Sequence, residues 1–405
     1  TSQFTQLGSY LDDMASDVNS QISDQVTQVN DLSEQIAGLN KKISLSEALG
    51  TTSNTLLDQR DLLVSQLSEL ADVDVTTQSN GSYTVSLSNG LALVSGNDSF
   101  DLKTTVSASD PTQTVVSYVD AAGHTTALDD ATFEGGSLGG LMDFRDTSLT
   151  DAQNQLGILA VSLTQAFNTL QAAGTDLNGD TGTALFSVDN PSIYGNTQNT
   201  GDATLSATFT DDVSALSATD YTVKYSATDG YTVTRNDTGA SVTSTYDSSN
   251  ATLTFAGMSV AISGTANSGD SFLVLPTRNA ASSFSTVTSD GSLIAAGTST
   301  GASDNSNALA MLNLQTSNIV SGSKTLSQTY STLVSDVGST ASKVAGQLET
   351  QSGLTDQLTA LQQSESGVNL DEEAANLIVY QQYYQACAKV VEVGTSLLDT
   401  LLDIN

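Results

Sequence analysis

Apolar residues recur at every third or fourth position over residues 5–46, a spacing that places them on one side of a helix. The stripe is narrow and sustained, as in the seam of a coiled coil. After a break at residues 50–54, a second helical pattern follows over residues 55–71. Because the connection is short, we expect an antiparallel helical hairpin. The first stripe consists of Leu7, Leu11, Met14, Val18, Ile22, Val26, Val29, Leu32, Ile36, Leu39 and Ile43.

The period of the pattern changes to two at Val73. Asn-Gly pairs at residues 80–81 and 89–90 separate alternating runs, and such pairs are the strongest short signal for a β-hairpin. Residues 114–128 predict a further hairpin. Alternation returns over residues 203–275, where Asp-Gly, Thr-Gly and Ser-Asn turns break it. We therefore expect two β regions.

Helical spacing returns between and after the β regions. One stretch follows residue 136 and ends near Gly174, and another covers about 304–362, where Gly338 and Gly346 weaken the prediction of an unbroken helix. A last helix begins with a predicted capping box formed by Asn369 and Glu372. Periodicity alone leaves open whether that helix is an ordinary core helix or pairs with another segment. Its apolar side consists of Leu370, Ala374, Leu377, Ile378, Tyr384, Ala388, Val391, Leu398, Leu401 and Leu402.

Helices at both chain ends with β regions between them predict an α+β multidomain fold. We expect a discontinuous helical bundle or coiled-coil trunk with antiparallel β domains inserted into it. The trunk is predicted to consist of residues 1–72, 136–174 and 304–369. A small β domain is expected at 73–135 and an outer β-rich domain at 175–303. Residues 370–405 are predicted to form a separate C-terminal assembly helix.

Composition narrows the possible functions. The chain has 405 residues and a formal net charge of −34, with 11 Lys and Arg against 45 Asp and Glu. This acidity argues against nucleic acid and against an anionic membrane surface as partners. With one cysteine, the chain cannot form an internal disulfide, and its apolar runs are too short for a transmembrane helix. Because the sequence begins at Thr1 without Met, we expect that the natural N-terminus lies upstream.

The last segment carries a specific motif. Residues 381–390, QQYYQACAKV, and the closing LDTLL at 398–402 resemble the C-terminal signature of bacterial flagellar axial proteins. Residues 54–70 and 135–146 resemble stretches of the hook-associated protein 1 family, the hook–filament junction proteins. Cys387 departs from the pattern, since a small polar residue is common there, and the family's usual N-terminal helix is absent from this sequence.

The resemblance implies a structural adapter that joins hook to filament. Such proteins form a ring of about eleven subunits, in which each contact is heterologous and repeats from copy to copy. The implied partners are further copies of the chain, the hook protein, the third hook-associated protein and an export chaperone on the C-terminal helix. The implied location is extracellular, at the hook–filament junction, after export by the flagellar type III system. The alternatives are another axial protein (hook, distal rod or third hook-associated protein) and an adhesin-like outer β module.

The predicted assembly interface, also the predicted chaperone-binding surface, lies on the last helix. Exposed amphipathic ends would be a liability in a free monomer, whereas neighbouring copies can bury one another's stripes. Its residues are Leu370, Leu377, Ile378, Tyr384, Ala388, Val391, Leu398, Leu401 and Leu402.

The sequence offers little support for catalysis. A single His and a single Cys exclude the usual zinc ligand sets. His124 is predicted to be a surface turn residue, and Cys387 a small buried packing residue. Residues 176–182, DLNGDTG, resemble a calcium loop only faintly and favour an Asx turn. We therefore predict that the chain is not an enzyme and has no cofactor and no metal.

Overall fold

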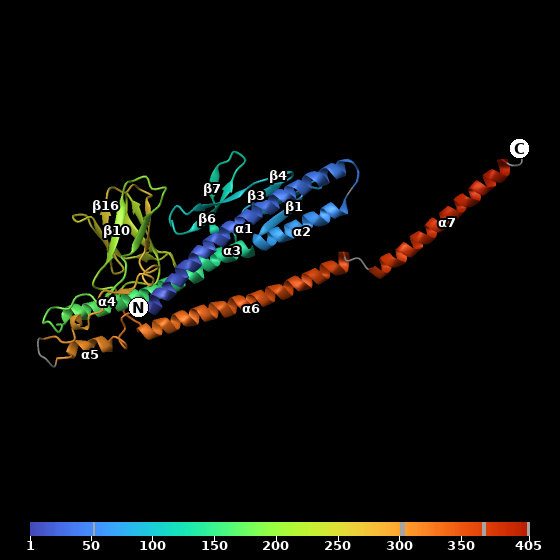
Figure 1. The fold of residues 1–405 in the computed structure, drawn as a ribbon. Coiled ribbons are helices and arrows are strands. Elements are labelled where there is room, and N and C mark those ends of the chain that lie inside the picture. Colours follow the sequence, from blue (N-terminus) through green and yellow to red (C-terminus); the bar gives the residue numbers. More distant parts are fainter. Residues whose placement is uncertain (52, 300–303, 367–369, 403–405) are drawn as a thin grey trace. The chain divides into compact units, whose positions relative to one another are not determined.

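The computed structural model describes residues 1–51, 53–299, 304–366 and 370–402. It divides into two compact units, Thr1–Val337 and Gly338–Asn405, and each is described here by itself. In the first unit, helices carry two β regions (Figure 1). Helices also form the described part of the second unit.

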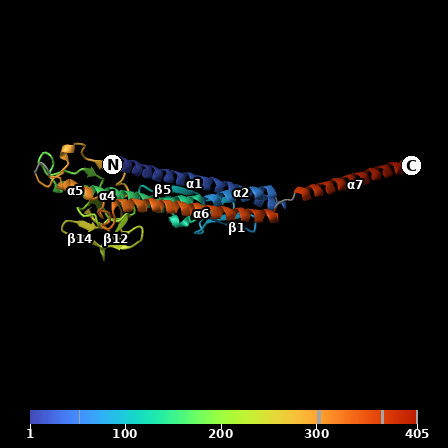
Figure 2. The same cartoon turned by 90° about the horizontal axis from the view of Figure 1, so that it is seen from below.

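The predicted helical hairpin is confirmed. It consists of α1 (Ser2–Ala48) and α2 (Asn54–Leu70), which lie side by side in Figures 1 and 2. The apolar stripe of α1 is buried along most of its length, and Val29 and Ile36 are fully covered. On α2 the buried residues are Leu67 and, unexpectedly for a cation, Arg60.

The middle helix is one rod with a wide turn inside it. α3 (Gly136–Asp143) leads into a π-helix, η2 (Phe144–Leu149), which continues as α4 (Thr150–Ala173). Gly174 is the C-cap of α4, which confirms the predicted end of this helix.

The predicted helical stretch at 304–362 is two helices, not one. α5 (Ser306–Asn313) is separated by turns from α6 (Leu326–Ser366), which begins in the first unit and continues into the second. Ser321 and Gly322 have φ values of 49° and 63°, a left-handed conformation that a right-handed helix cannot contain. Gly338 and Gly346 lie inside α6 and do not interrupt it.

The first β region forms two small antiparallel sheets, named here the inner β layer (residues 73–127). The Asn-Gly pairs at 80–81 and 89–90 form the predicted hairpin turns, with Gly81 and Gly90 at positive φ. The sheets have the orders β1-β2-β3-β4 and β5-β6-β7. The strands are β1 (Val73–Thr77), β2 (Tyr83–Leu87), β3 (Ala92–Ser95), β4 (Asp98–Ser99), β5 (Leu102–Val106), β6 (Thr114–Val119) and β7 (Thr125–Ala127), followed by the 3-10 turn η1 (Asp130–Thr132).

The inner β layer shares one hydrophobic core with the helices. Val85 and Leu93 of its strands belong to the same buried cluster as Val26 of α1, Leu67 of α2 and Leu138 of α3. The sheets therefore bury their hydrophobic faces against the helices, and packing of this kind stabilises small sheets.

The second β region forms a sandwich, named here the outer β domain (residues 192–275). Its two sheets have the orders β10-β16-β15-β14 and β13-β12-β11-β17-β9, which confirms the antiparallel strands expected over 203–275. The strands are β9 (Ser192–Gly195), β10 (Thr204–Phe209), β11 (Tyr221–Ser226), β12 (Gly230–Arg235), β13 (Ser241–Val242), β14 (Ser244–Asp247), β15 (Thr252–Phe255), β16 (Met258–Ser263) and β17 (Ser271–Leu275). β8 (Phe186–Ser187) pairs with β18 (Ser285–Thr286) outside the sandwich, and the 3-10 turn η3 (Gly291–Leu293) follows.

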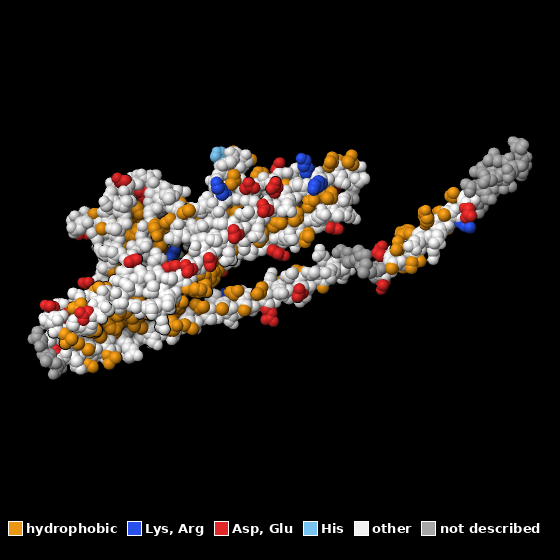
Figure 3. Space-filling model, viewed as in Figure 1, with side chains coloured by type: hydrophobic (Ala, Val, Ile, Leu, Met, Phe, Trp, Pro, Cys, Tyr) orange, Lys and Arg blue, Asp and Glu red, His pale blue; other side chains and the backbone are white. Residues whose placement is uncertain are grey.

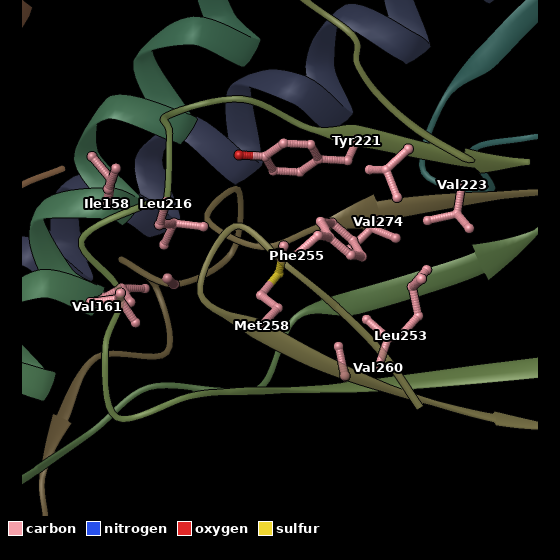
Figure 4. Close-up of a cluster of buried hydrophobic side chains, with 14 of the residues drawn as sticks. Ile158, Val161, Leu216, Tyr221, Val223, Leu253, Phe255, Met258, Val260 and Val274 are labelled. Carbon is pink, nitrogen blue, oxygen red and sulfur yellow. The ribbon is translucent and has the colours of Figure 1, made fainter. Parts of the chain in front are cut away.

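The core of the outer β domain continues into the trunk. Figure 4 shows Ile158 and Val161 of α4 next to Leu216, with Tyr221 and Phe255 of the sandwich beyond them. Buried side chains from helix and sheets thus form one cluster, which fixes the base of the sandwich on α4.

In the second unit, the last helix is α7 (Leu370–Leu402). Its first turn contains Asp371, Glu372 and Glu373, and negative charge at this end of a helix interacts favourably with the helix dipole. Asn369 of the predicted capping box lies outside the described residues. The four-part domain division expected from the sequence stays a prediction.

Candidate assembly surface

Large apolar side chains are exposed on α7. Leu377 is 58% exposed, Ile378 56%, Tyr384 78% and Val391 65%. Ala388 is exposed as well. Figure 3 shows hydrophobic side chains along this helix. Exposed apolar groups at this density mark surfaces that become buried in an assembly.

The spacing of these residues is that of a coiled-coil seam. Leu370, Leu377, Tyr384, Val391 and Leu398 follow one another at intervals of seven. The positions four residues after these are Ala374, Gln381, Ala388, Thr395 and Leu402, of which three are apolar. Two such sets form the seam of a heptad repeat, which supercoils with a partner helix that has the same repeat.

Some of the predicted interface falls outside what the structure describes. Leu370, Leu398, Leu401 and Leu402 lie on helix α7, but their side chains are not among the described ones. Their place in the interface therefore stays a prediction.

Three exposed apolar residues of α7 were not among the predicted interface residues: Val379, Tyr380 and Tyr383. Tyr380, together with Leu377 and Tyr384, lines a shallow hollow of about 290 Å³ on one side of the helix. The sequence signal that could have identified Tyr380 was its spacing of three residues from Leu377, which keeps both residues on one face of the helix.

Helix α6 carries a second exposed stripe. Tyr330, Val334, Val337, Val344 and Leu348 are each between 52% and 70% exposed. Ala341 completes alternating steps of four and three from Tyr330 to Leu348. Leu326 and Leu333 lie on the same face, four residues before Tyr330 and Val337, and pack into buried clusters of the first unit. α6 is therefore anchored at its start and has an apolar face left over, as a helix of a larger bundle would.

The polar residues singled out from the sequence are structural. His124 is exposed and its Nδ1 lies 3.0 Å from Oδ2 of Asp120, at the turn between β6 and β7. Hydrogen bonds from the backbone and side chain of His124 lower the pKa of Asp120. In the loop at 176–182, Oδ1 of Asp176 accepts hydrogen bonds from the backbone N–H groups of Asn178 and Asp180, which is the expected Asx turn.

The prediction that Cys387 is buried is wrong. Its thiol is exposed on α7, as are the neighbouring described side chains of that helix. A small apolar residue between two alanines suits a core helix, but α7 lies outside the buried clusters of the described residues.

Neither a metal cluster nor a membrane-spanning helix is found among the described residues. Within the described ranges, no three His, Cys, Asp or Glu side chains are grouped so that they could hold a metal ion. The helices described here lack the length and apolar content needed to cross a membrane.

Comparison with known proteins identifies the family. Residues 1–186 match the model of the flagellar hook-associated protein FlgK helical domain, and residues 194–276 match the flagellar hook-associated protein 1, D2-like domain. Residues 362–404 match the flagellar basal body rod FlgEFG protein C-terminal model, and α7 lies within this range.

Full-length relatives agree with these matches. The chain is 40% identical to flagellar hook-associated protein 1 of Salmonella typhimurium, over 99% of this chain and 74% of the relative. It is 38% identical to the Escherichia coli protein of the same name, over 99% of this chain and 74% of the relative.

A solved structure has the same fold. The flagellar hook junction protein FlgK from Burkholderia pseudomallei superposes with a TM-score of 0.81 at 33% identity, covering 90% of this chain and 87% of that one. The chain belongs to the flagellar hook-associated protein 1 family.

Proposed function

We propose that this chain is a structural adapter of the bacterial flagellum, located outside the cell at the junction of hook and filament. Membership of the hook-associated protein 1 family supports this function. The observation that carries the mechanism is the exposed heptad face of α7, because a monomer gains nothing from such a surface. Nothing among the matches favours an adhesin-like role for the outer β domain.

The assembly interface is the set of residues predicted from the sequence, extended by Tyr380. Fully burying an apolar side chain of this size stabilises by about 1.5–3 kcal/mol. The five apolar residues at intervals of seven on each helix therefore supply enough free energy to offset the loss of freedom on association. The partner of α7 is a helix with the same repeat in an adjacent copy.

The proposed arrangement is a ring of about eleven copies with head-to-tail contacts. The hook protein contacts one side of the ring and the third hook-associated protein the other. Before export by the flagellar type III system, the same face of α7 is covered by a chaperone. In this proposal the trunk (1–72, 136–174, 304–369) carries the β regions (73–135, 175–303), with which it shares hydrophobic cores, and the helix at 370–405 provides the assembly contacts.

A charge placed on the heptad face tests this proposal. In Leu377→Glu/Tyr384→Glu, two carboxylates would be buried in the seam, where an unpaired charge is costly. We expect this variant, as purified full chain, to lose binding to the ends of isolated hooks. Using isolated hooks separates assembly from export and from chaperone binding.

The matched control is Ala386→Glu, which adds negative charge on the opposite side of the same exposed helix, two residues after Tyr384. We expect it to bind hook ends as the unmodified chain does. If the double variant binds hook ends with unchanged affinity, the heptad face of α7 is not the assembly interface.

A further inference from the structure

A short segment after the last strand of the outer β domain, residues 277–284, is held tightly between two helices. A Cβ atom on Gly157 of α4 would lie 1.7 Å from the carbonyl oxygen of Thr277, so the backbones touch there. A Cβ on Gly8 of α1 would lie 2.5 Å from the backbone nitrogen of Ser282. The hydroxyl of Thr277 also donates to Oδ1 of Asn154 over 2.7 Å. The backbone of this segment is thus fixed to the trunk.

Arg278 of this segment reaches out to both β regions. Its Nη1 donates to Oδ2 of Asp110, in the loop between β5 and β6, over 2.7 Å. Its Nη2 donates to Oδ2 of Asp220, the residue before β11. The three side chains are 10%, 4% and 3% exposed. One guanidinium therefore joins the trunk, the inner β layer and the outer β domain in a place that solvent barely reaches.

A backbone hydrogen bond lies beside this cluster. The N–H of Thr197, in the outer β domain, donates to the carbonyl of Ala108 over 2.8 Å. Ala108 belongs to the same loop as Asp110. The loop at 107–113 is consequently the place where the two β regions meet.

We propose that Arg278 is a pin that fixes the orientation of the outer β domain on the trunk and the inner β layer. The apolar contact between the sandwich and α4 holds the domain in place, but hydrophobic contact is non-directional. Charge-assisted hydrogen bonds from a planar fork have a defined geometry, so they select one orientation. Arg278 is a positioning residue, and this role goes beyond the junction function and does not depend on it.

Neutralising one carboxylate tests the pin. In Asp110→Asn, the tie to the inner β layer loses its charge while every residue of the outer β domain is kept. We expect the amide of Thr197 to exchange with solvent about tenfold faster, because its hydrogen bond to Ala108 lies beside the weakened tie and opens more often. The unaltered amides of β11 and β16 report that the sandwich stays folded.

A distance measurement gives a second readout. In a Cys387→Ala background, spin labels at Lys103→Cys on β5 and Thr254→Cys on β15 lie on the two β regions, both at exposed positions. We expect Asp110→Asn to broaden the distance distribution between these labels. Arg278→Lys, which keeps the charge but loses the fork, should broaden it less than Arg278→Met does.

The matched control is Asp237→Asn, which neutralises the carboxylate of the Arg235–Asp237 pair within the outer β domain. We expect it to leave both the exchange of Thr197 and the distance distribution unchanged. If Asp110→Asn behaves like Asp237→Asn in both measurements, Arg278 is not a pin. If Arg278→Met unfolds the sandwich, Asp110→Asn decides the question.

Discussion

At the residue scale, three asparagines of α1 join the helix to the inner β layer. Asn30 bonds both the N–H and the carbonyl of Leu102, at 2.8 Å each. Asn19 bonds the carbonyl of Thr112 and the N–H of Thr114 in the same way. Each amide side chain thus occupies the place of a neighbouring strand, and satisfies backbone groups that would otherwise be unpaired.

The third asparagine is fully buried. Asn40 donates to the carbonyls of Tyr83 and Gly96, and its Oδ1 accepts from the N–H of Tyr83 and from Nη1 of Arg60. The guanidinium of Arg60 lies over the ring of Tyr83, with 3.3 Å to the centroid. Nη1 of Arg60 also donates to the carbonyl of Gly81 over 2.7 Å, whereas its buried Nε has no hydrogen-bond partner among the described residues.

We predict that Asn40→Ala lowers the free energy of unfolding by about 3 kcal/mol, because it leaves several buried polar groups without partners. Urea unfolding followed by circular dichroism measures the change. Asn19→Ala, at a more exposed site, should cost about 1 kcal/mol. Equal and small losses in the two variants would contradict this account of Asn40.

Asp130 makes the free energy of unfolding depend on pH. Oδ2 of Asp130 lies 2.7 Å from Nη2 of Arg145, but Asp146 shares that guanidinium. Burial, and then the charge of Asp146, outweigh the effect of Arg145 and raise the pKa of Asp130 from 3.8 to about 6. Ionised Asp130 is therefore disfavoured in the folded chain.

The raised pKa of Asp130 makes the folded chain less stable as the pH rises. The stabilisation from protonated Asp130 is fully present below about pH 4 and is lost as the pH rises through about 6. Because the group is partly exposed, we expect a fall of about 1 kcal/mol in the free energy of unfolding. Urea titrations between these pH values should show the fall in the unmodified chain and in Asp129→Asn, but not in Asp130→Asn.

At the element scale, periodicity predicted which segments form helices and strands, and local signals predicted the hairpin turns. It did not predict the asparagine contacts, because Asn40 interrupts no apolar pattern and its partners are distant in sequence. It also missed the break before α6, which depends on two residues at positive φ. For α7 the heptad spacing was present in the sequence, but whether Cys387 is covered depends on partners that a single chain does not encode.

One substitution at two glycines separates helix propensity from packing. Gly346 of α6 has open space around it, whereas Gly157 of α4 touches the backbone of Thr277. We predict that Gly346→Ala stabilises α6 by about 0.5–1 kcal/mol. Gly157→Ala should destabilise the chain, because the backbones must separate. Thermal unfolding followed by far-ultraviolet circular dichroism measures both, and the same sign in both variants would contradict the packing argument.

At the scale of the whole molecule, strong acidity opposes association of copies. With a net charge of −34, neighbouring chains repel one another unless salt screens them. We predict that sedimentation shows self-association of the full chain that increases with protein concentration and with ionic strength. Removal of residues 370–405 should abolish both dependences. Identical sedimentation of the two chains at every concentration would contradict assembly through α7.

The π-helix between α3 and α4 allows one rod to serve two cores. Leu138 and Met142 precede the wide turn and face the core beneath the inner β layer, whereas Ile158 and Val161 follow it and face the sandwich. A wide turn contains one residue more than an α-helical turn, and each residue rotates the helix by about 100°. Deleting one residue from 144–149 would therefore rotate the apolar face of α4 by roughly a quarter turn relative to that of α3. The extra residue of this turn thus determines which side of the rod is apolar where the sandwich packs.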